Sequence, residues 1–406
     1  FMKLRVLIIG LVWPEPTSSA AGWRMLQLID ELKKISNDIH FACAASKSVS
    51  SHPLEVLDII THDIVLNDSS FNDFISDLVP DVVVYDRFIT EEQFSWRVKE
   101  LFPNIVSVLD TEDLHFVRRA RTTAFKTNAE VNFDTADCYR ELSSIYRSDL
   151  SIIISKFEYD LLIDHFNIPS KQLLYLPFIE AEIPNETKDQ LPDFNSRKDF
   201  MFIGNFIHEP NYQTVLQLKK IWTTIKKRLP NTQIHIYGAY ASQKVLQLNN
   251  ANDGFIIKGK ADDVNEIMKQ YRVLVAPIPF GAGLKGKFVD GFRNSLPNVT
   301  SKIGAEGMSA ENWGGFIAEN ETDFIDAVYK LYNDETEWNK AVTHGFDILN
   351  NQFSERIWSG ILKDAVLKIY ENTEVHRSNL FIQKILWQNG LQAVKYMSLW
   401  IEQKNK

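Results

Sequence analysis

Short runs of apolar residues recur along the N-terminal half of the chain, separated by segments with helical spacing. Residues 4–9 (LRVLII) form one such run, and residues 23–35 (WRMLQLIDELKKI) carry apolar side chains at helical intervals. The strand pattern returns in the segments IHFACAA, DIVL, DVVVYD, NIVSVLD and SIIIS. Buried strands that alternate with helices predict βαβ units around a parallel sheet.

The alternation restarts after a polar, proline-containing segment at residues 181–198, which we predict to be a linker. A long amphipathic helix is expected at residues 212–229, among strands with the sequences DFMFIG, QIHIYG, GFIIKG, YRVLVAPI and NVTS. From residue 321 to about residue 389 the pattern is helical. The sequence therefore predicts an α/β protein with two doubly wound domains, whose strand ends face a shared cleft where such folds bind ligands.

Composition and charge narrow the classes of function. The net charge of −9 argues against a general nucleic-acid binder, which needs a basic face. Cys43 and Cys138 match no metal-ligand spacing, so two reduced thiols are expected. The sequence contains no signal peptide and no apolar run of about 20 residues, so we expect a cytoplasmic protein without a membrane span.

The most informative segment is the glycine-rich stretch at residues 281–286, between an expected strand and an expected helix. Glycines let backbone N–H groups approach a ligand closely, and a helix N-terminus favours negative charge. Lys285 and Lys287 add cations at the same place. The combination suits a nucleoside diphosphate whose charge rises as a sugar bond breaks, with Lys285 in the main role and Lys287 in support. A tight turn with solvated lysines is the alternative.

Several segments together resemble the GT-B glycosyltransferases of the family 4 type, and the resemblance covers nearly the whole chain. Its most specific pieces are FIGNFIHEPNYQTVLQL (202–218), RLPNTQIHIYGAY (228–240), VLVAPIPFGAGLKGKFVD (273–290) and SLPNVTSKIGAEGM (295–308). The supporting pieces in the N-terminal half are WPEPTSSAAGWRMLQL (13–28), LDTEDLHFVRRAR (109–121) and RSDLSIIISKFE (147–158).

This resemblance implies a GT-B architecture of two Rossmann-like domains around a central cleft. The expected acceptor domain covers residues 1–180 and is joined by C-terminal helices at about 360–406, and the expected donor domain covers residues 199–359. The resemblance also implies a retaining transferase that uses a nucleoside-diphosphate sugar as its substrate, with no metal and no further cofactor. The sequence contains no Asp-x-Asp pair and no P-loop, and its first loop lacks the Gly-x-Gly-x-x-Gly motif expected of a dinucleotide-binding oxidoreductase, so these motifs point to no rival class.

Donor binding is assigned by the resemblance to loops that follow strands of the C-terminal domain. Gly204 permits close backbone approach, Asn205 can donate a hydrogen bond, and Asp290 replaces, with a shorter reach, the glutamate that holds the ribose in most relatives. His208 stands in a loop that supplies basic residues in many relatives, and an exposed loop histidine is the alternative. The expected donor-binding residues are Gly204, Asn205, His208, Gly238, Lys260, Gly281, Ala282, Gly283, Leu284, Lys285, Gly286 and Asp290.

The segment at residues 109–121 departs from the family pattern. Glu112 stands where relatives carry a histidine near the transferring sugar, and His115 follows three residues later. If a helix begins there, the two side chains share a face, and a carboxylate near the anomeric carbon could stabilise positive charge. The catalytic candidates are therefore Glu112, His115 and Lys285. A helix-capping acid beside a surface histidine is the alternative.

Acceptor binding is expected in the N-terminal domain. The small residues at 18–22 (SSAAG) open a helix and match a loop that approaches the donor phosphate and the acceptor in relatives, although a plain serine N-cap explains them as well. Arg118, Arg119 and Arg121 form either a solvated face or a clamp for a phosphorylated acceptor. The expected acceptor-binding residues are Ser19, Ala20, Ala21, Gly22, Arg24 and Arg118.

These expectations lead to a retaining glycosyltransferase that acts on a glycan or lipid-linked acceptor in surface polysaccharide synthesis. A degenerate protein that binds a nucleotide sugar or a partner without turnover is the main alternative, because Asp290, Ala282 and Glu112 depart from the family pattern. A sugar-nucleotide epimerase is a weaker one. The aromatic, mildly basic C-terminal segment either docks onto the protein itself or contacts a membrane surface.

Overall fold

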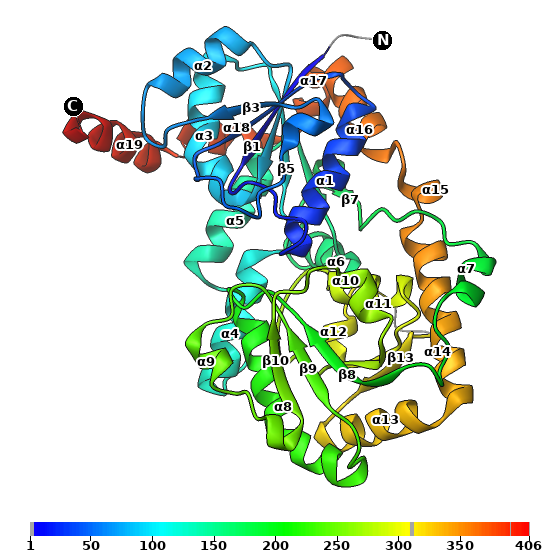
Figure 1. The fold of residues 1–406 in the computed structure, drawn as a ribbon. Coiled ribbons are helices and arrows are strands. Elements are labelled where there is room, and N and C mark those ends of the chain that lie inside the picture. Colours follow the sequence, from blue (N-terminus) through cyan, green and yellow to red (C-terminus); the bar gives the residue numbers. More distant parts are fainter. Residues whose placement is uncertain (1–3, 309–311, 390, 406) are drawn as a thin grey trace.

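The structure, a computed structural model, describes residues 4–308, 312–389 and 391–405 of the 406-residue chain. Residues 1–3, 390 and 406, which the predicted acceptor domain and its returning helices include, lie outside this part. Figure 1 shows two α/β domains, one built from the N-terminal half of the chain and one from the C-terminal half. The predicted α/β class with two parallel, doubly wound sheets is confirmed.

The first domain contains a parallel sheet of seven strands in the order β3-β2-β1-β4-β5-β6-β7 among the described residues. The strands are β1 (Arg5–Gly10), β2 (Asp38–Cys43), β3 (Ile60–Asp63), β4 (Val82–Asp86), β5 (Val106–Asp110), β6 (Leu150–Ile153) and β7 (Leu173–Tyr175). The helices between them are α1 (Ala20–Lys33), η1 (Leu54–Leu57), α2 (Ser70–Leu78), α3 (Arg87–Leu101), α4 (His115–Thr127), α5 (Ala136–Arg147), α6 (Lys156–Asp164) and η2 (Ser170–Gln172).

The second domain contains a parallel sheet of six strands in the order β10-β9-β8-β11-β12-β13, again among the described residues. The strands are β8 (Lys198–Ile203), β9 (Ile234–Tyr237), β10 (Phe255–Gly259), β11 (Tyr271–Ala276), β12 (Asn298–Ser301) and β13 (Gly315–Ala318). The helices are α8 (Glu209–Arg228), α9 (Gln243–Leu246), η3 (Ala251–Asp253), α10 (Val264–Met268), α11 (Gly286–Arg293), α12 (Lys302–Ala305), α13 (Glu321–Asn333), α14 (Glu335–Ile348) and η4 (Leu349–Phe353).

The chain crosses between the domains twice. The first crossing contains the short helix α7 (Asn185–Gln190), and the second runs through α15 (Glu355–Trp358). A β-bridge between Glu180 and Ser354 ties the two crossings together. The remaining helices are α16 (Ile361–Glu371), α17 (Thr373–Arg377), α18 (Phe381–Asn389) and α19 (Gln392–Asn405). Leu362, Val366 and Ile369 of α16 join the core of the first domain, so the C-terminal helices return to that domain (Figure 1).

The structure differs from the sequence-based expectation at several elements. The segment DIVL was expected to form a strand, but β3 ends at Asp63, where that segment begins. β3 is an edge strand with no fully buried residue, so it lacks the apolar run typical of the central strands. The strands β7 and β13 were not predicted, because they are short and carry weak patterns.

Candidate functional site

Loops that follow strands of both sheets meet at the boundary between the domains. The glycine-rich turn lies between β11 and α11, and it faces the first domain. A Cβ added to Gly283 would lie 2.7 Å from Cβ of Asp113, and one added to Gly286 would lie 3.0 Å from Cβ of Ala20. Gly283 has φ of +61°, a conformation that glycine adopts without strain. Glycine at these two positions therefore permits the close approach of the domains.

The turn presents backbone donors at the start of α11. Lys285 is the N-cap residue, and its side chain makes no capping hydrogen bond, so the first amides of this eight-residue helix have no capping side chain in the part of the chain that the structure describes. Gly281 and Leu284 are buried, Ala282 packs against the first domain, and Gly286 is half-buried. A phosphate oxygen is the kind of acceptor that such amides lack.

The two lysines of the turn point to different partners. Nζ of Lys285 donates to the carbonyl of Gly283 at 2.9 Å, whereas Nζ of Lys287 donates to Oδ1 of Asn211 at 2.8 Å. Burial lowers the pKa of Lys285 to about 8, and burial together with Lys285 lowers the pKa of Lys287 to about 7. Among the described residues, neither ammonium is hydrogen-bonded to a carboxylate, so an anion bound between them would raise both pKa values.

The loop after β8 lies beside this turn. Asn211, which accepts from Lys287, also donates to the carbonyl of Asn205 at 2.8 Å and packs against Gly204. Nδ2 of Asn205 donates across the boundary to the carbonyl of Ser18 at 3.2 Å. His208 is exposed at the N-cap of α8 and forms no capping bond. The structure thus brings both predicted phosphate elements together.

Gly238 and Lys260 follow the neighbouring strands. The amide of Gly238 donates to the carbonyl of Gly259 at 2.8 Å, and a Cβ added to Gly238 would lie only 2.1 Å from the carbonyl oxygen of Gly204. Nζ of Lys260 reaches Oγ of Ser50 in the first domain at 3.1 Å. Gly238 therefore packs directly under the loop after β8, while Lys260 lies at the rim of the domain boundary.

Asp290 lies inside α11, one turn beyond the glycine-rich loop. Oδ1 of Asp290 accepts from Arg293 at 2.9 Å, and Arg293 also pairs with Glu180 at the domain crossing. Burial raises the pKa of Asp290, against the attraction of Arg293. The carboxylate expected to hold a ribose is therefore engaged by an arginine in this structure.

Carboxylates cluster at the carboxyl ends of β4 and β5. Both carboxylate oxygens of Asp110 are buried without a hydrogen-bond partner in the described part of the chain. Burial raises the pKa of Asp110 and of Glu112, against the attraction of Arg24 and Arg87 respectively. Glu112 and Arg87 have φ of +62° and +69°, a conformation that non-glycine residues rarely adopt and that often marks functional sites.

The predicted helical relation between Glu112 and His115 is wrong. α4 begins at His115 with Leu114 as its N-cap, so Glu112 lies in the left-handed turn before the helix. His115 is buried and its ring contacts Phe88 edge-on, and burial lowers its pKa to about 3. Glu112 stays at the strand end with the carboxylate cluster, whereas His115 is a neutral side chain packed behind it.

The small residues before α1 divide between two roles. Oγ of Ser19 caps the helix by accepting from the amide of Gly22 at 3.1 Å, and Gly22 packs on the backbone of Glu15. Ala20 borders the glycine-rich turn, next to the half-buried Ala21. Ser19 is therefore the N-cap residue. The position of Ala20 beside the turn is the one expected for a loop that approaches the donor phosphate.

Arg24 corrects an expectation. It was expected among the acceptor-binding residues, but its side chain is fully buried and donates to the carbonyls of Leu176 and Pro177. Helical spacing placed it one turn into α1, and the side chain turned inward because these carbonyls need donors. Arg118 remains half-buried and pairs with Asp113 at 2.7 Å, so it lies beside the turn at Gly283.

Two residues that join the domains were missed or misjudged from the sequence. Oε1 of Glu158 accepts the amide of Gly283 at 2.7 Å and that of Leu114 at 3.1 Å, and Oε2 is buried without a partner in the described residues. Arg121, expected on a solvated face or a phosphate clamp, donates to both oxygens of Glu306 and to the carbonyl of Gly281. Glu158 lies in the first turn of α6, and its sequence neighbours gave no sign of the partner in the second domain.

Among the described residues, no three His, Cys, Asp or Glu side chains are arranged to hold a metal ion. Over the same residues, none of the helices combines the length and the apolar character needed to cross a bilayer.

Comparisons with known proteins give a family match for part of the chain and a fold for most of it. Residues 197–334 match the family described as Glycosyl transferases group 1. A curated relative, an uncharacterized 44.6 kDa protein in the cps region of Klebsiella pneumoniae, is 22% identical over 174 residues, which are 40% of this chain and 45% of that protein. The match therefore spans less than half of the relative's length.

Solved structures agree on the fold. Sucrose-phosphate synthase from Thermosynechococcus elongatus has a TM-score of 0.66 at 12% identity, over 93% of this chain and 99% of that one. Anabaena Alr3699/HepE, solved with UDP and glucose, has a TM-score of 0.64 at 11% identity, over 93% and 100%. Staphylococcus aureus TarM, solved as a mutant with Fondaparinux, alpha-GlcNAc-glycerol and UDP, has a TM-score of 0.56 at 12% identity, and the match spans 74% of this chain and 58% of TarM. The GT-B fold that the resemblance implied is confirmed.

Proposed function

We propose that this chain, a glycosyltransferase of the group 1 type with the GT-B fold, moves a hexose from a nucleoside diphosphate to a glycan or lipid-linked acceptor with retention of configuration. The observation that carries the proposal is the amide-lined turn before α11, which faces the first domain and has Lys285 and Lys287 beside it. We propose that the reaction needs neither a metal nor a further cofactor, because these donors can neutralise the diphosphate themselves.

The roles of the residues follow from their positions. The amides at the start of α11 and the Lys285 ammonium would hold the diphosphate as its charge grows. Lys287 lies between this turn and the loop at Gly204 and Asn205, so it suits the second phosphate. The carboxylate of Asp290 would release Arg293 and accept hydrogen bonds from the ribose hydroxyls instead. Closure of the domains would exclude water from the reacting sugar.

Glu112 suits a role different from the one first expected. Burial beside other carboxylates favours its protonated form, and a neutral acid donates a hydrogen bond instead of stabilising positive charge. We propose that it orients the transferred sugar from the N-terminal side of the boundary. Surface polysaccharide synthesis is the proposed setting, and the UDP named for HepE and TarM makes a UDP-sugar the first donor to test.

A second candidate, binding without turnover, is favoured by one specific observation. The Gly283 amide, which a donor phosphate would need, already has the carboxylate of Glu158 as its acceptor, and Asp290 is held by Arg293. In such a protein the boundary would be a permanent interface. Slow release of nucleoside diphosphate from the donor without acceptor indicates an enzyme, whereas tight binding with no release indicates this second candidate.

The phosphate assignment is tested by thermal unfolding in the presence of UDP, GDP and other nucleoside diphosphates. A ligand that binds the folded state raises the unfolding temperature in proportion to its excess over the dissociation constant. We expect one base to give a clear rise, which Lys285→Ala removes. Lys340→Ala on the exposed surface of α14 is the matched control and keeps the rise. A rise that survives Lys285→Ala refutes the assignment.

A further inference from the structure

The last two helices turn polar side chains toward the protein and large apolar side chains toward the solvent. In α18, Gln383 is fully buried, while Phe381 and Ile385 are 67% and 58% exposed. In α19, the residues that turn inward are Ser398 and Glu402. The outward face of α19 carries Tyr396, Met397 and Trp400, which are 64%, 57% and 59% exposed.

Polar contacts hold these helices to the first domain. Nε2 of Gln383 donates to Oδ1 of Asp149 at 3.0 Å, and the indole N–H of Trp387 donates to the carbonyl of Arg147 at 3.0 Å. Arg97 pairs with Glu402 at 3.3 Å and donates to Ser398. Specific hydrogen bonds thus define how the helices are oriented. This orientation keeps their apolar faces directed away from the domain.

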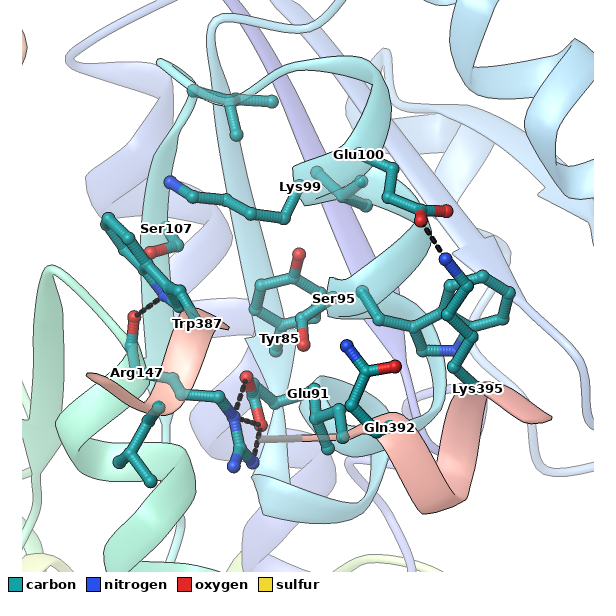
Figure 2. Close-up of a pocket in the computed structure, with 15 residues that line it drawn as sticks. Tyr85, Glu91, Ser95, Lys99, Glu100, Ser107, Arg147, Trp387, Gln392 and Lys395 are labelled. Atoms are coloured by element: carbon teal, nitrogen blue, oxygen red, sulfur yellow. Dashed lines mark hydrogen bonds and ion pairs between the residues drawn. The ribbon is translucent and has the colours of Figure 1, made fainter. Parts of the chain in front are cut away.

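A cavity of about 220 Å³ remains between the two helices and α3, and Figure 2 shows the residues that line it, Trp387 and Gln392 among them. Lys395 of α19 pairs with Glu100 at its edge, and the Arg147–Glu91 pair lies at its base. Leu386 and Trp387 of α18 face this cavity. Packing toward the protein does not account for the large apolar side chains of the two helices that are exposed: Phe381, Ile382, Ile385, Tyr396, Met397, Leu399 and Trp400.

The charge of this segment is opposite to that of the whole chain. Residues 381–406 contain four lysines and one glutamate, a balance of +3, whereas the whole chain carries −9. The glutamate, Glu402, is buried against Arg97, and Lys395 pairs with Glu100. The positive charge of the described outer surface therefore comes from the exposed Lys384 and Lys404. Lys404 lies over the ring of Trp400, at the edge of the apolar face. In Figure 1, α19 projects from the first domain at its outer edge.

We propose that the outward faces of α18 and α19 bind an anionic lipid surface, with their axes along the membrane plane. Aromatic residues with a polar atom, such as Tyr396 and Trp400, suit the boundary between headgroups and acyl chains, and lysines beside them attract anionic headgroups. The apolar side chains would leave water there without any change in the polar contacts that hold the helices. The inference stands on this surface alone and is independent of sugar transfer.

The test is co-sedimentation of the full chain with vesicles, without any sugar nucleotide. Vesicles of equal parts phosphatidylcholine and phosphatidylglycerol should carry the protein into the pellet, and pure phosphatidylcholine vesicles should carry much less. The double variant Met397→Ser/Trp400→Ser should lower the partition coefficient about tenfold or more, because two apolar side chains no longer insert. Raised salt should weaken binding of the unchanged protein.

Val56→Ser/Val65→Ser is the matched control, because it removes two exposed apolar side chains on the same domain, outside the two helices. This control should bind vesicles as the unchanged protein does, and circular dichroism should show both variants folded. Equal binding to neutral and anionic vesicles overturns the proposal. So does a chain that binds neither but forms a dimer that Met397→Ser/Trp400→Ser dissociates, since a second copy then covers the face.

Discussion

At the scale of single residues, Glu158 shows how one carboxylate links the domains. It belongs to α6 in the first domain and is fully buried, yet one of its oxygens accepts the amide of Gly283 in the second domain. Burial, with Asp113 nearby, raises the pKa of Glu158 to about 7. A glutamate in the unfolded chain titrates near 4.5. The folded protein therefore holds this proton more tightly than the unfolded chain does.

This difference predicts a pH dependence of stability. Because the folded pKa is the higher one, the contribution of Glu158 to stability is fully present below about pH 4.5 and is lost as the pH rises to about 7. Glu158→Gln keeps an oxygen for both amides but cannot ionise. Relative to the unchanged protein, we expect the variant to gain about 2 kcal/mol of unfolding free energy between pH 5 and pH 8. Urea unfolding at the two pH values measures this, and parallel curves for the two proteins contradict it.

At the scale of elements, the turn between β11 and α11 determines how closely the domains approach. Gly283 and Gly360 both have positive φ, +61° and +84°. Only Gly283 faces a neighbour, since a Cβ there would lie 2.7 Å from Asp113, whereas nothing lies within 4 Å of one at Gly360. Variants at these two glycines can therefore distinguish the cost of backbone strain from the cost of a clash between the domains.

Gly283→Ala and Gly360→Ala should each lose about 1 kcal/mol of stability to backbone strain. Only Gly283→Ala should also weaken nucleoside diphosphate binding, because the added methyl group pushes the turn away from Asp113 and displaces the amides of α11. Urea unfolding measures the first effect and the ligand-induced rise in unfolding temperature measures the second. If both variants keep the full rise, the turn does not set the binding geometry.

Elements were the part of the structure that the sequence predicted best. DVVVYD and YRVLVAPI have long buried runs, and they became the central strands β4 and β11. The position of the glycine-rich turn was predicted correctly, because glycines and lysines that follow a strand together rarely serve another structural purpose. Glu158 and Arg24 could not be assigned, because their partners lie 125 and about 150 residues away along the chain. A local pattern carries no information about such partners.

At the scale of the whole molecule, a few polar contacts hold the domains together around two crossings of the chain. Glu180, next to the first crossing, accepts from Gln27 of the first domain and pairs with Arg293 of the second. On the other side of the boundary, Arg121 of α4 reaches both oxygens of Glu306 at 2.7 and 2.9 Å. The crossings are covalent and remain in any state, so opening must break the contacts of Arg121 together with the other polar contacts across the boundary, such as that of Glu158 with Gly283.

Arg121→Ala should therefore shift the molecule toward an open arrangement. A bidentate pair between charged groups, both largely shielded from water, is worth about 1–3 kcal/mol, and that free energy no longer favours closure in the variant. Arg119→Ala, two residues earlier on the same helix, is the matched control, because Arg119 pairs with Asp137 inside the first domain. Small-angle X-ray scattering should show a larger radius of gyration for Arg121→Ala alone, and nucleoside diphosphate should bring it back toward the compact value. Equal radii for the two variants without ligand would mean that the arginine at 121 does not control how far the two domains separate.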